Sequence, residues 1–272
     1  MSTAPPMRAA AVRVAAAGDI SCKPGLAVTA SQCEMEATAR LVEQFDPAFV
    51  LPLGDLQYEY GELANFQTSY DKTWGRFRDR TKPVVGNHEY AGGRARGYFA
   101  YWGDQVAPPN GWYAFDVAEV GWRVIVLNSV CSVVGCDDDS EQASWLRGQL
   151  SASTARCTLA AFHHPRRTSG LHGEYEPMDP LWRQLVDAGA DLALSGHDHH
   201  YERFAPEGTL RQFVAGTGGR NLYPVVARSR GSEFVDTRNF GILELDLREG
   251  AYGWRFRTIS GAVLDEGQAD CR

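Results

Sequence analysis

Two histidines, His197 and His199, stand one residue apart directly after the apolar run 192–194. The run predicts a buried strand, and residues i and i+2 of an extended chain point to the same side. Both imidazoles can therefore face one point just beyond the strand end. Because imidazole is the commonest metal ligand among side chains near neutral pH, the pair indicates a metal site.

Four further strand-like segments, at 12–17, 48–53, 83–85 and 158–162, are followed by residue types that bind metal ions. In the same order along the chain, these residues are Asp19, Asp55, Asn87 and His163. In open sheets whose strands alternate with helices, ligands bind beyond the carboxyl ends of the strands. We therefore expect all five strand ends to meet at one metal site.

The segments between these strand ends predict the elements that position them. Helical spacing of apolar residues predicts helices at 34–45, 63–77, 140–150 and 178–188, the third with Ser140 as a possible N-cap. Two antiparallel strands are expected at 112–117 and 122–127, and the C-terminal part predicts strands at 213–215, 242–247, 252–258 and 263–268. Because strands alternate with helices, we expect a largely parallel sheet covered by helices.

The composition is that of an ordinary globular protein. The chain has 272 residues, and no linker-like segment, charge block or repeat interrupts it. We therefore expect one domain over residues 12–272, preceded by a tail at 1–11. A formal net charge of −7 argues against a nucleic-acid-binding surface. No stretch approaches the ~18 apolar residues of a membrane-spanning helix, so no membrane insertion is expected. The oligomeric state stays open.

The cysteines indicate an oxidising compartment. Their number is even, and two pairs are close in sequence, which is typical of a disulfide framework. The expected pairs are Cys22–Cys33, Cys131–Cys136 and Cys157–Cys271. Six reduced thiols are the alternative, and a zinc site is less expected because no C-x-x-C occurs. Three disulfides favour a secreted, periplasmic or cell-surface protein, although the N-terminus lacks the pattern of a signal peptide.

The ordered motifs GD, GDxxY, GNHE, H-x-P and GHxHxYER cover residues 18–203. This set resembles the calcineurin-like metallophosphoesterase superfamily and, within it, the purple acid phosphatases. Many superfamily members begin with D-x-H, whose histidine is a metal ligand, whereas Ser21 stands at that position here. Tyr58 stands where the purple acid phosphatases place a tyrosinate ligand. The resemblance implies a single-domain, four-layer α/β/β/α sandwich, in which two sheets face each other and helices cover both.

The resemblance also implies two metal ions. The first would be bound by Asp19, Asp55, Tyr58 and His199. The second would be bound by Asp55, Asn87, His163 and His197, so that Asp55 bridges the two. A phenolate and carboxylates favour a trivalent ion such as Fe(III), whereas an amide, two imidazoles and a shared carboxylate suit Zn, Mn or Fe(II). Two ions ~3.5–4 Å apart can generate a hydroxide and clamp phosphoryl oxygens.

The implied activity is hydrolysis of a small phosphate monoester by metal-bound hydroxide, as in acid phosphatases. His88 or the loop residue His172 would protonate the leaving group, and Glu89 is expected to orient a histidine. His164 is expected to point away from the site along its strand. His200 is expected outside the ligand set, and Arg94, Arg96, Arg166 and Arg167 are interpreted as surface groups rather than phosphate ligands.

Two alternatives stay open. A phosphodiesterase or nucleotide hydrolase would use the same metal site, and the loops at 92–109 and 168–177 would decide between the substrates. A non-catalytic binding module on this fold would be expected to have lost ligands, but all seven ligand positions hold suitable residue types. The glycine-rich segment 216–220 is expected to form a tight turn beside the site, because it lacks the Lys-Ser/Thr of a phosphate-binding loop.

Overall fold

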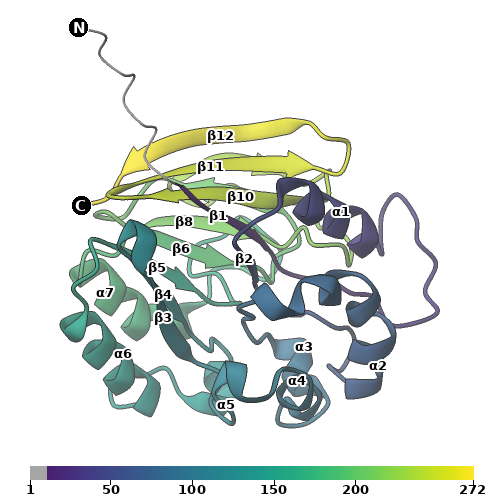
Figure 1. Cartoon of the computed structure of the whole chain (residues 1–272), viewed down its shortest axis with the longest axis horizontal. Coiled ribbons are helices and arrows are strands. Elements are labelled where there is room, and N and C mark those ends of the chain that lie inside the picture. Colours follow the sequence, from purple (N-terminus) through teal and green to yellow (C-terminus); the bar gives the residue numbers. More distant parts are fainter. Residues whose placement is uncertain (1–10) are drawn as a thin grey trace, which may run out of the picture.

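Residues 11–272 are described by a computed structural model, in which the strands form two mixed sheets (Figure 1). All but the last residue of the expected tail, 1–11, lies outside the described residues. The first sheet has the order β12 (Val263–Asp270), β11 (Ala251–Thr258), β10 (Gly241–Arg248), β1 (Val12–Ala17) and β2 (Phe49–Pro52). The second has the order β3 (Tyr113–Val117), β4 (Trp122–Val126), β5 (Cys157–Ala161), β6 (Leu192–Ser195), β8 (Arg211–Ala215), β7 (Tyr201–Phe204) and β9 (Ser232–Asp236).

Strand direction differs from the sequence-based expectation. Among the strands of the described residues, parallel pairs are formed by β1 with β2 and by the neighbours β4, β5, β6 and β8. The other pairs are antiparallel, so the prediction of a largely parallel sheet is wrong. The reason is local: β10 and β11 are joined through Glu249 and Gly250 alone, and so short a connection permits only a hairpin.

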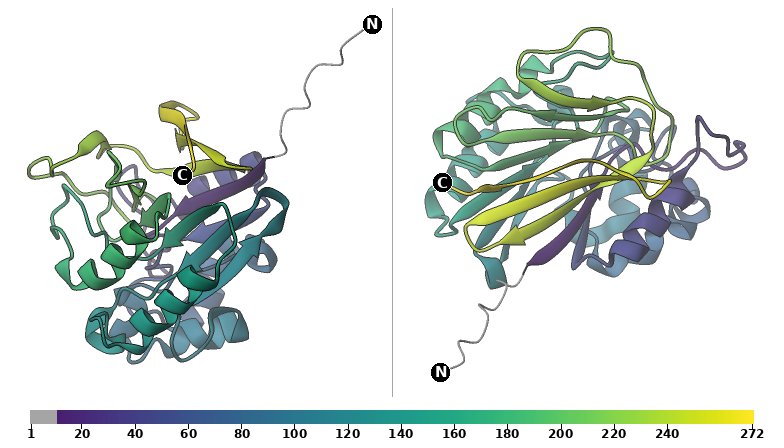
Figure 2. Two further views of the ribbon diagram at one scale, coloured as in Figure 1. Left: turned by 90° about the vertical axis from the view of Figure 1, so that its left-hand side faces the viewer. Right: turned by 90° about the horizontal axis from the view of Figure 1, so that it is seen from above.

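The two sheets face each other across a buried apolar core. Alternate residues of β1 show the arrangement, because Val14 and Ala16 face the second sheet while Ala15 and Ala17 face the helices. Strands of both sheets contribute to the inner core, for example Leu51 and Phe213. Figure 2 shows the C-terminal strands β10 to β12 extending the first sheet beside β1.

Helices cover both outer faces, which confirms the predicted α/β/β/α sandwich (Figure 1). On the first sheet lie α1 (Met35–Phe45), α2 (Leu63–Thr68), α3 (Asn87–Ala91) and α4 (Arg96–Trp102). On the second lie α6 (Glu141–Ala152) and α7 (Asp179–Asp187), with the short α5 (Cys131–Val134) at the end of β4. The Ser140 hydroxyl accepts a hydrogen bond from the Ala143 amide, so Ser140 caps α6 as predicted.

The predicted helix at 63–77 is broken. It consists of α2 followed by two 3₁₀ segments, η1 (Tyr70–Lys72) and η2 (Trp74–Arg80). The breaks fall at Ser69 and Thr73, whose backbone angles are not helical. The aromatic rings of Tyr70 and Trp74 are fully buried against the first sheet. Packing of these rings therefore overrides a regular helical path.

All three predicted disulfides are present. Cys22–Cys33, Cys131–Cys136 and Cys157–Cys271 have Cα–Cα distances of 5.4, 5.1 and 5.7 Å, respectively. Such a set indicates an oxidising, extracytoplasmic location. Among the helices of residues 11–272, none is long and apolar enough to cross a membrane.

Candidate metal centre

Carboxyl ends of strands from both sheets meet at one point. The Gly18 amide, at the end of β1, donates to the carbonyl of Ala215 at the end of β8, over 2.8 Å. The Asp19 amide donates to the Gly54 carbonyl after β2, and the Gly196 amide after β6 donates to the His163 carbonyl after β5. The chain therefore delivers its strand-end side chains to a shared junction between the sheets.

One group of side chains gathers around the Tyr58 hydroxyl. Its oxygen lies 2.8 Å from Asp19 Oδ1 and 3.0 Å from His199 Nε2. Asp19 Oδ1 and His199 Nε2 are themselves 3.1 Å apart. All three residues are buried, so a phenol, a carboxylate and an imidazole converge in a space closed to solvent.

A second group gathers around the His163 ring. His163 Nε2 lies 3.1 Å from Asn87 Oδ1 and 3.1 Å from Asp55 Oδ2. Ligand atoms of Asp55, His163 and His197 all lie within 4.8 Å of one another. Asp55 Oδ2 is also 3.2 Å from the Tyr58 hydroxyl, so one carboxylate oxygen contacts both groups. The structure thus brings together all seven residues that the motifs single out.

The donor set fits metal binding. Asp19 and Asp55 are fully buried, and their ion-pair partners among the described residues are histidines. Buried carboxylates of this kind are normally paired or coordinated to a metal. Glycines leave the room that the donors need: a Cβ at Gly86 would lie 2.2 Å from Asp55 Oδ1, and one at Gly54 would lie 2.4 Å from His163 Nδ1.

Three of the converging residues have left-handed backbones. The φ angles are 61° at Asp19, 50° at Asp55 and 69° at His197. Non-glycine residues rarely adopt this conformation, and each instance costs on the order of 1–3 kcal/mol. The turn lets the chain reverse sharply at the strand end, so the side chain enters the junction instead of continuing along the strand.

Neighbouring groups fix the orientation of the His163 ring and favour the charged forms of His163 and Asp55. The Nδ1–H of His163 donates to the Leu53 carbonyl over 2.8 Å, which leaves Nε2 facing the cluster. Burial opposes a charge on this ring, but the adjacent Asp55 carboxylate raises the pKa of His163 to about 9. Burial likewise opposes the charge of Asp55, yet His163 and the other nearby histidines hold the pKa of Asp55 well below its usual range.

Glu89 does not orient a histidine, so that expectation is wrong. Its carboxylate instead accepts hydrogen bonds from the backbone amides of Asp55, Leu56, Gln57 and Gly86, over 2.8–3.2 Å. Burial and the nearby Asp55 raise the pKa of Glu89 to about 7. Glu89 therefore positions the backbone of the loop that carries Asp55 and Tyr58, and not a histidine ring.

His88 and His172 stand at the mouth of the junction. The His88 ring lies 4.2 Å from the Tyr58 ring, and its Nδ1–H donates to the Glu59 carbonyl over 2.7 Å. The His172 ring lies 4.3 Å from the His197 ring, and the His172 side chain is 44% exposed. Both rings can thus reach a molecule that enters the junction from solvent.

The remaining histidines lie outside the two donor groups. The expectation that His164 points away along its strand is wrong. Its ring lies 4.4 Å from the His197 ring and stacks on Tyr175, while Nδ1 hydrogen-bonds with the Ser129 hydroxyl. Burial, and then the charge of the adjacent His163, lower the pKa of His164 to about 3. His200 forms an ion pair with Glu202, which also accepts hydrogen bonds from the 168–172 loop.

Sequence reasoning missed two residues at the mouth, Arg220 and Tyr223. The Arg220 guanidinium lies 5.3 Å from the centre of the Tyr58 ring and pairs with Glu59 at 2.8 Å. Tyr223 stacks on His199 with ring centres 4.1 Å apart. The turn at 216–220 does lie beside the site, since the Arg220 amide donates to the Asp19 carbonyl. Its position directly after these glycines is the only signal that could have identified Arg220.

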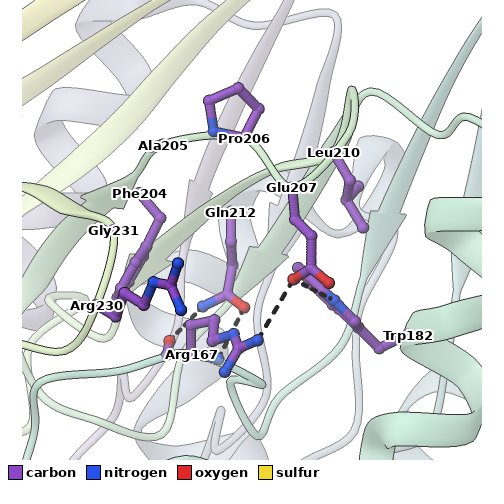
Figure 3. Close-up of a pocket in the computed structure, with 10 residues that line it drawn as sticks. All are labelled: Arg167, Trp182, Phe204, Ala205, Pro206, Glu207, Leu210, Gln212, Arg230 and Gly231. Carbon is purple, nitrogen blue, oxygen red and sulfur yellow. Dashed lines mark hydrogen bonds and ion pairs between the residues drawn. The ribbon is translucent and has the colours of Figure 1, made fainter.

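The arginines considered from the sequence lie elsewhere. Arg166 pairs with Asp179 and Glu174, and Arg167 pairs with Glu174 and Glu207. Arg94 and Arg96 are exposed. A cavity of about 480 Å³ beside Arg167 is lined by Trp182, Phe204, Glu207, Leu210, Gln212 and Arg230, among others (Figure 3). None of the seven converging residues lines it, so this cavity is separate from the candidate centre.

Residues 12–201 match the calcineurin-like phosphoesterase family, and the chain belongs to it. It is similar to an uncharacterized protein of Mycobacterium tuberculosis, with 30% identity over 69% of this chain and 40% of the relative. Identity is 27% to purple acid phosphatase 22 of Arabidopsis thaliana, over 79% of this chain and 55% of that protein. It is 25% to human tartrate-resistant acid phosphatase type 5, over 66% and 64%. The chain thus spans about half the length of these relatives, and its homology to the acid phosphatases is distant.

Solved structures show the same fold over nearly the whole chain. The purple acid phosphatase from yellow lupin seeds superposes with a TM-score of 0.74 and 19% identity, covering 97% of this chain and 54% of that one. GAP50, the anchor in the inner membrane complex of Plasmodium, superposes with a TM-score of 0.75 and 18% identity, covering 97% and 90%. At these identities the likeness concerns the fold alone.

Proposed function

We propose that the protein is a dinuclear metal-dependent phosphatase that hydrolyses small phosphate monoesters. The observation that carries this proposal is the shared oxygen of Asp55, 3.2 Å from the Tyr58 hydroxyl and 3.1 Å from His163 Nε2. One carboxylate oxygen between two donor groups is the arrangement that a pair of bridged ions requires. The family and its distant acid phosphatase relatives support the reaction class.

The two donor groups differ in chemistry. The first ion would be held by Asp19, Asp55, Tyr58 and His199. The second would be held by Asp55, Asn87, His163 and His197. Two carboxylates and a phenolate are hard anionic donors that suit Fe(III), whereas the more neutral second set suits Zn, Mn or Fe(II). Such a pair of ions, when bound, supplies Lewis acidity and lowers the pKa of water at the site.

Tyr58 supports a strongly acidic ion in the first position. Burial, and then the carboxylates of Asp19 and Asp55, raise the pKa of Tyr58 well above 10. Its hydroxyl accordingly donates to Asp19. A highly charged cation such as Fe(III) would offset this penalty and favour the phenolate.

The histidines at the mouth would handle the substrate. His88 stands beside the junction, with Nε2 3.9 Å from Asp55 Oδ2, and would donate to a phosphoryl oxygen. His172 stands on the opposite rim, beside His197, and would serve the leaving oxygen. General acid catalysis of this kind contributes roughly 10²–10⁴-fold to a rate.

The proposal is tested by loading the purified protein with iron and a divalent ion and recording its absorption and its activity. We expect a tyrosinate-to-Fe(III) charge-transfer band that Tyr58→Phe abolishes and that Tyr223→Phe, the matched control beside His199, retains. We expect phosphomonoesters to be hydrolysed faster than diesters. A colourless, active protein carrying two zinc ions would contradict the Fe(III) assignment, and a preference for diesters or nucleotides would replace the monoesterase proposal.

A binding role without catalysis is the rival of a different class. The Plasmodium protein with this fold is described as an anchor, so the fold does not by itself decide for an enzyme. The complete donor set favours catalysis here. If no form of the protein with two bound metal ions hydrolyses a phosphate ester, the binding role would be favoured.

A further inference from the structure

Asp198, between the two histidines of the GHxH motif, forms hydrogen bonds to a loop rather than to the converging donors. Its Oδ2 accepts from the Thr168 hydroxyl over 2.6 Å, and its Oδ1 accepts from His172 Nδ1 over 2.9 Å. The backbone amide of His172 donates to the same Oδ1 over 3.3 Å. One carboxylate therefore holds both ends of the segment 168–172.

Asp198 is closely packed by the segments around it. The side chain is fully buried, although Leu171 and His172 in the loop above it are exposed. A Cβ at Gly170 would lie 2.2 Å from Asp198 Cγ, and a Cβ at Gly216 would lie 2.2 Å from the Asp198 carbonyl oxygen. Two separate segments thus close over this residue only because they lack side chains there. A buried carboxylate needs a partner, and within residues 11–272 its ion pair is with His172.

This contact determines the direction of the His172 ring. With Nδ1 held by Asp198, the other nitrogen, Nε2, has no hydrogen-bond partner among the described residues. The ring lies 4.3 Å from His197 and 5.6 Å from Tyr223, at the rim of the junction. An exposed histidine on a loop would otherwise sample several rotamers, each of which carries Nε2 to a different place.

We propose that Asp198 is a positioning residue, which holds the His172 ring so that Nε2 serves the leaving oxygen of a phosphate ester. The inference rests on the proposed phosphatase function. As the P–O bond to the leaving group breaks, its electron pair stays on that oxygen, which takes the Nε2 proton. Water supplies the oxygen that bonds to phosphorus and returns a proton to solvent. Asp198 itself touches neither phosphorus nor the leaving group.

The test compares leaving groups. Asp198→Asn keeps the volume, but it leaves one acceptor oxygen where the carboxylate offers two and removes the charge that strengthens the bond to His172. With an alkyl phosphate, whose leaving oxygen needs a proton, we expect kcat of the metal-loaded Asp198→Asn protein to fall about 100-fold. With 2,4-dinitrophenyl phosphate, whose leaving group needs none, we expect little change. His172→Ala should show the same dependence, and the double variant should be no slower than His172→Ala.

Controls separate positioning from structural damage. Asp191→Asn also removes a buried carboxylate, one that holds the Thr158 and Arg272 amides far from the junction, and should not change the leaving-group dependence. If Asp198→Asn does not fold, Thr168→Val removes the other anchor of Asp198 and should give the same pattern more weakly.

Two outcomes would overturn the inference. Equal losses for all leaving groups in Asp198→Asn, or losses that multiply with those of His172→Ala, would show that Asp198 does not act through His172. In both cases the active wild type would leave the proposed function standing. A metal-loaded wild type that hydrolyses no phosphate ester would instead overturn the proposed function and this inference together.

Discussion

The candidate centre has a floor and a mouth that are built differently. The floor consists of Asp19, Asp55, Tyr58, His163 and His199, which are all buried and come directly from strand ends or the turns after them. The mouth consists of His88, His172, Arg220 and Tyr223, which are partly exposed. Floor side chains contact one another. Mouth side chains are held by neighbouring backbone and by residues that belong to neither set, such as Asp198 and Glu59.

This difference separates two tasks that one site has to perform. The floor is rigid because its side chains are locked between two sheets, so it can offer a fixed set of donors to cations. The mouth is attached by a few contacts to loops, so it can differ between relatives without disturbing the floor. We therefore expect floor variants to lose metal and mouth variants to keep it.

The largest effect is expected at Asp55, the residue that both donor groups share. Asp55→Asn removes the charge and one strong donor from both groups. Since even second-sphere changes cost about 10–100-fold in metal affinity, we expect the loss to exceed about 100-fold for at least one ion, with activity falling in parallel. Metal content after dialysis and a metal titration would check this. A variant that retains both ions with unchanged affinity would break the distinction between floor and mouth.

His88→Ala tests the mouth. The ring is held by the Glu59 carbonyl and by stacking on Tyr58, and it is not among the converging donors. We expect both ions to be retained and kcat for an alkyl phosphate to fall about 100-fold. Metal analysis and steady-state kinetics on the same preparation are the measurement. Loss of an ion from this variant would move His88 to the floor.

Glu89→Gln tests whether a residue that holds the backbone of the floor, without being a metal donor itself, contributes to metal affinity. An amide has one acceptor oxygen, so it cannot satisfy the four backbone amides that the carboxylate accepts, and its NH2 would face donors. We expect metal affinity to fall about 10-fold and the protein to unfold at a lower temperature. A metal titration and a thermal melt check this. Unchanged affinity would confine the floor to its direct donors.

The smallest effect is expected at Arg220, which borders both regions. A cation over the Tyr58 ring stabilises the electrons of a phenolate, so Arg220→Gln should shift the proposed charge-transfer band to longer wavelength without loss of iron. Absorption spectra of the iron-loaded proteins measure the shift. Arg78→Gln, which removes a cation 4.6 Å from the ring of Tyr101, should leave the band in place. A band that stays fixed in Arg220→Gln would place Arg220 wholly in the mouth.

The floor was predictable because its signals are local. Most donors come just after an apolar run, as Asp19 follows 12–17 and His163 follows 158–162, so a strand end and its polar residue can be found together. Tyr58 was singled out by the family resemblance instead. The order of these motifs then carried the family resemblance and the four-layer fold. The disulfide pairs followed from cysteine number and spacing.

At the mouth, the family resemblance singled out His88 and His172, but the contacts that hold the mouth were not predictable because they join distant parts of the chain. Glu59 and Arg220 are 161 positions apart, and no spacing rule connects them. The Asp198–His172 contact spans 26 positions between a strand end and a loop without secondary structure. The direction of the C-terminal strands was misjudged for a related reason: apolar runs reveal a strand, but the two-residue connection after β10 decides how it pairs.

The hydrogen bond from Gly18 to the Ala215 carbonyl also bears on the order of events during synthesis. It joins Gly18 to a residue that emerges from the ribosome almost two hundred positions later. Contacts of such long sequence separation form slowly and late in folding. We therefore expect the complete centre to form only after β8 has been synthesised. Its cations would be taken from the compartment in which folding finishes and the disulfides close, so the metal supply there would decide which ions the protein carries.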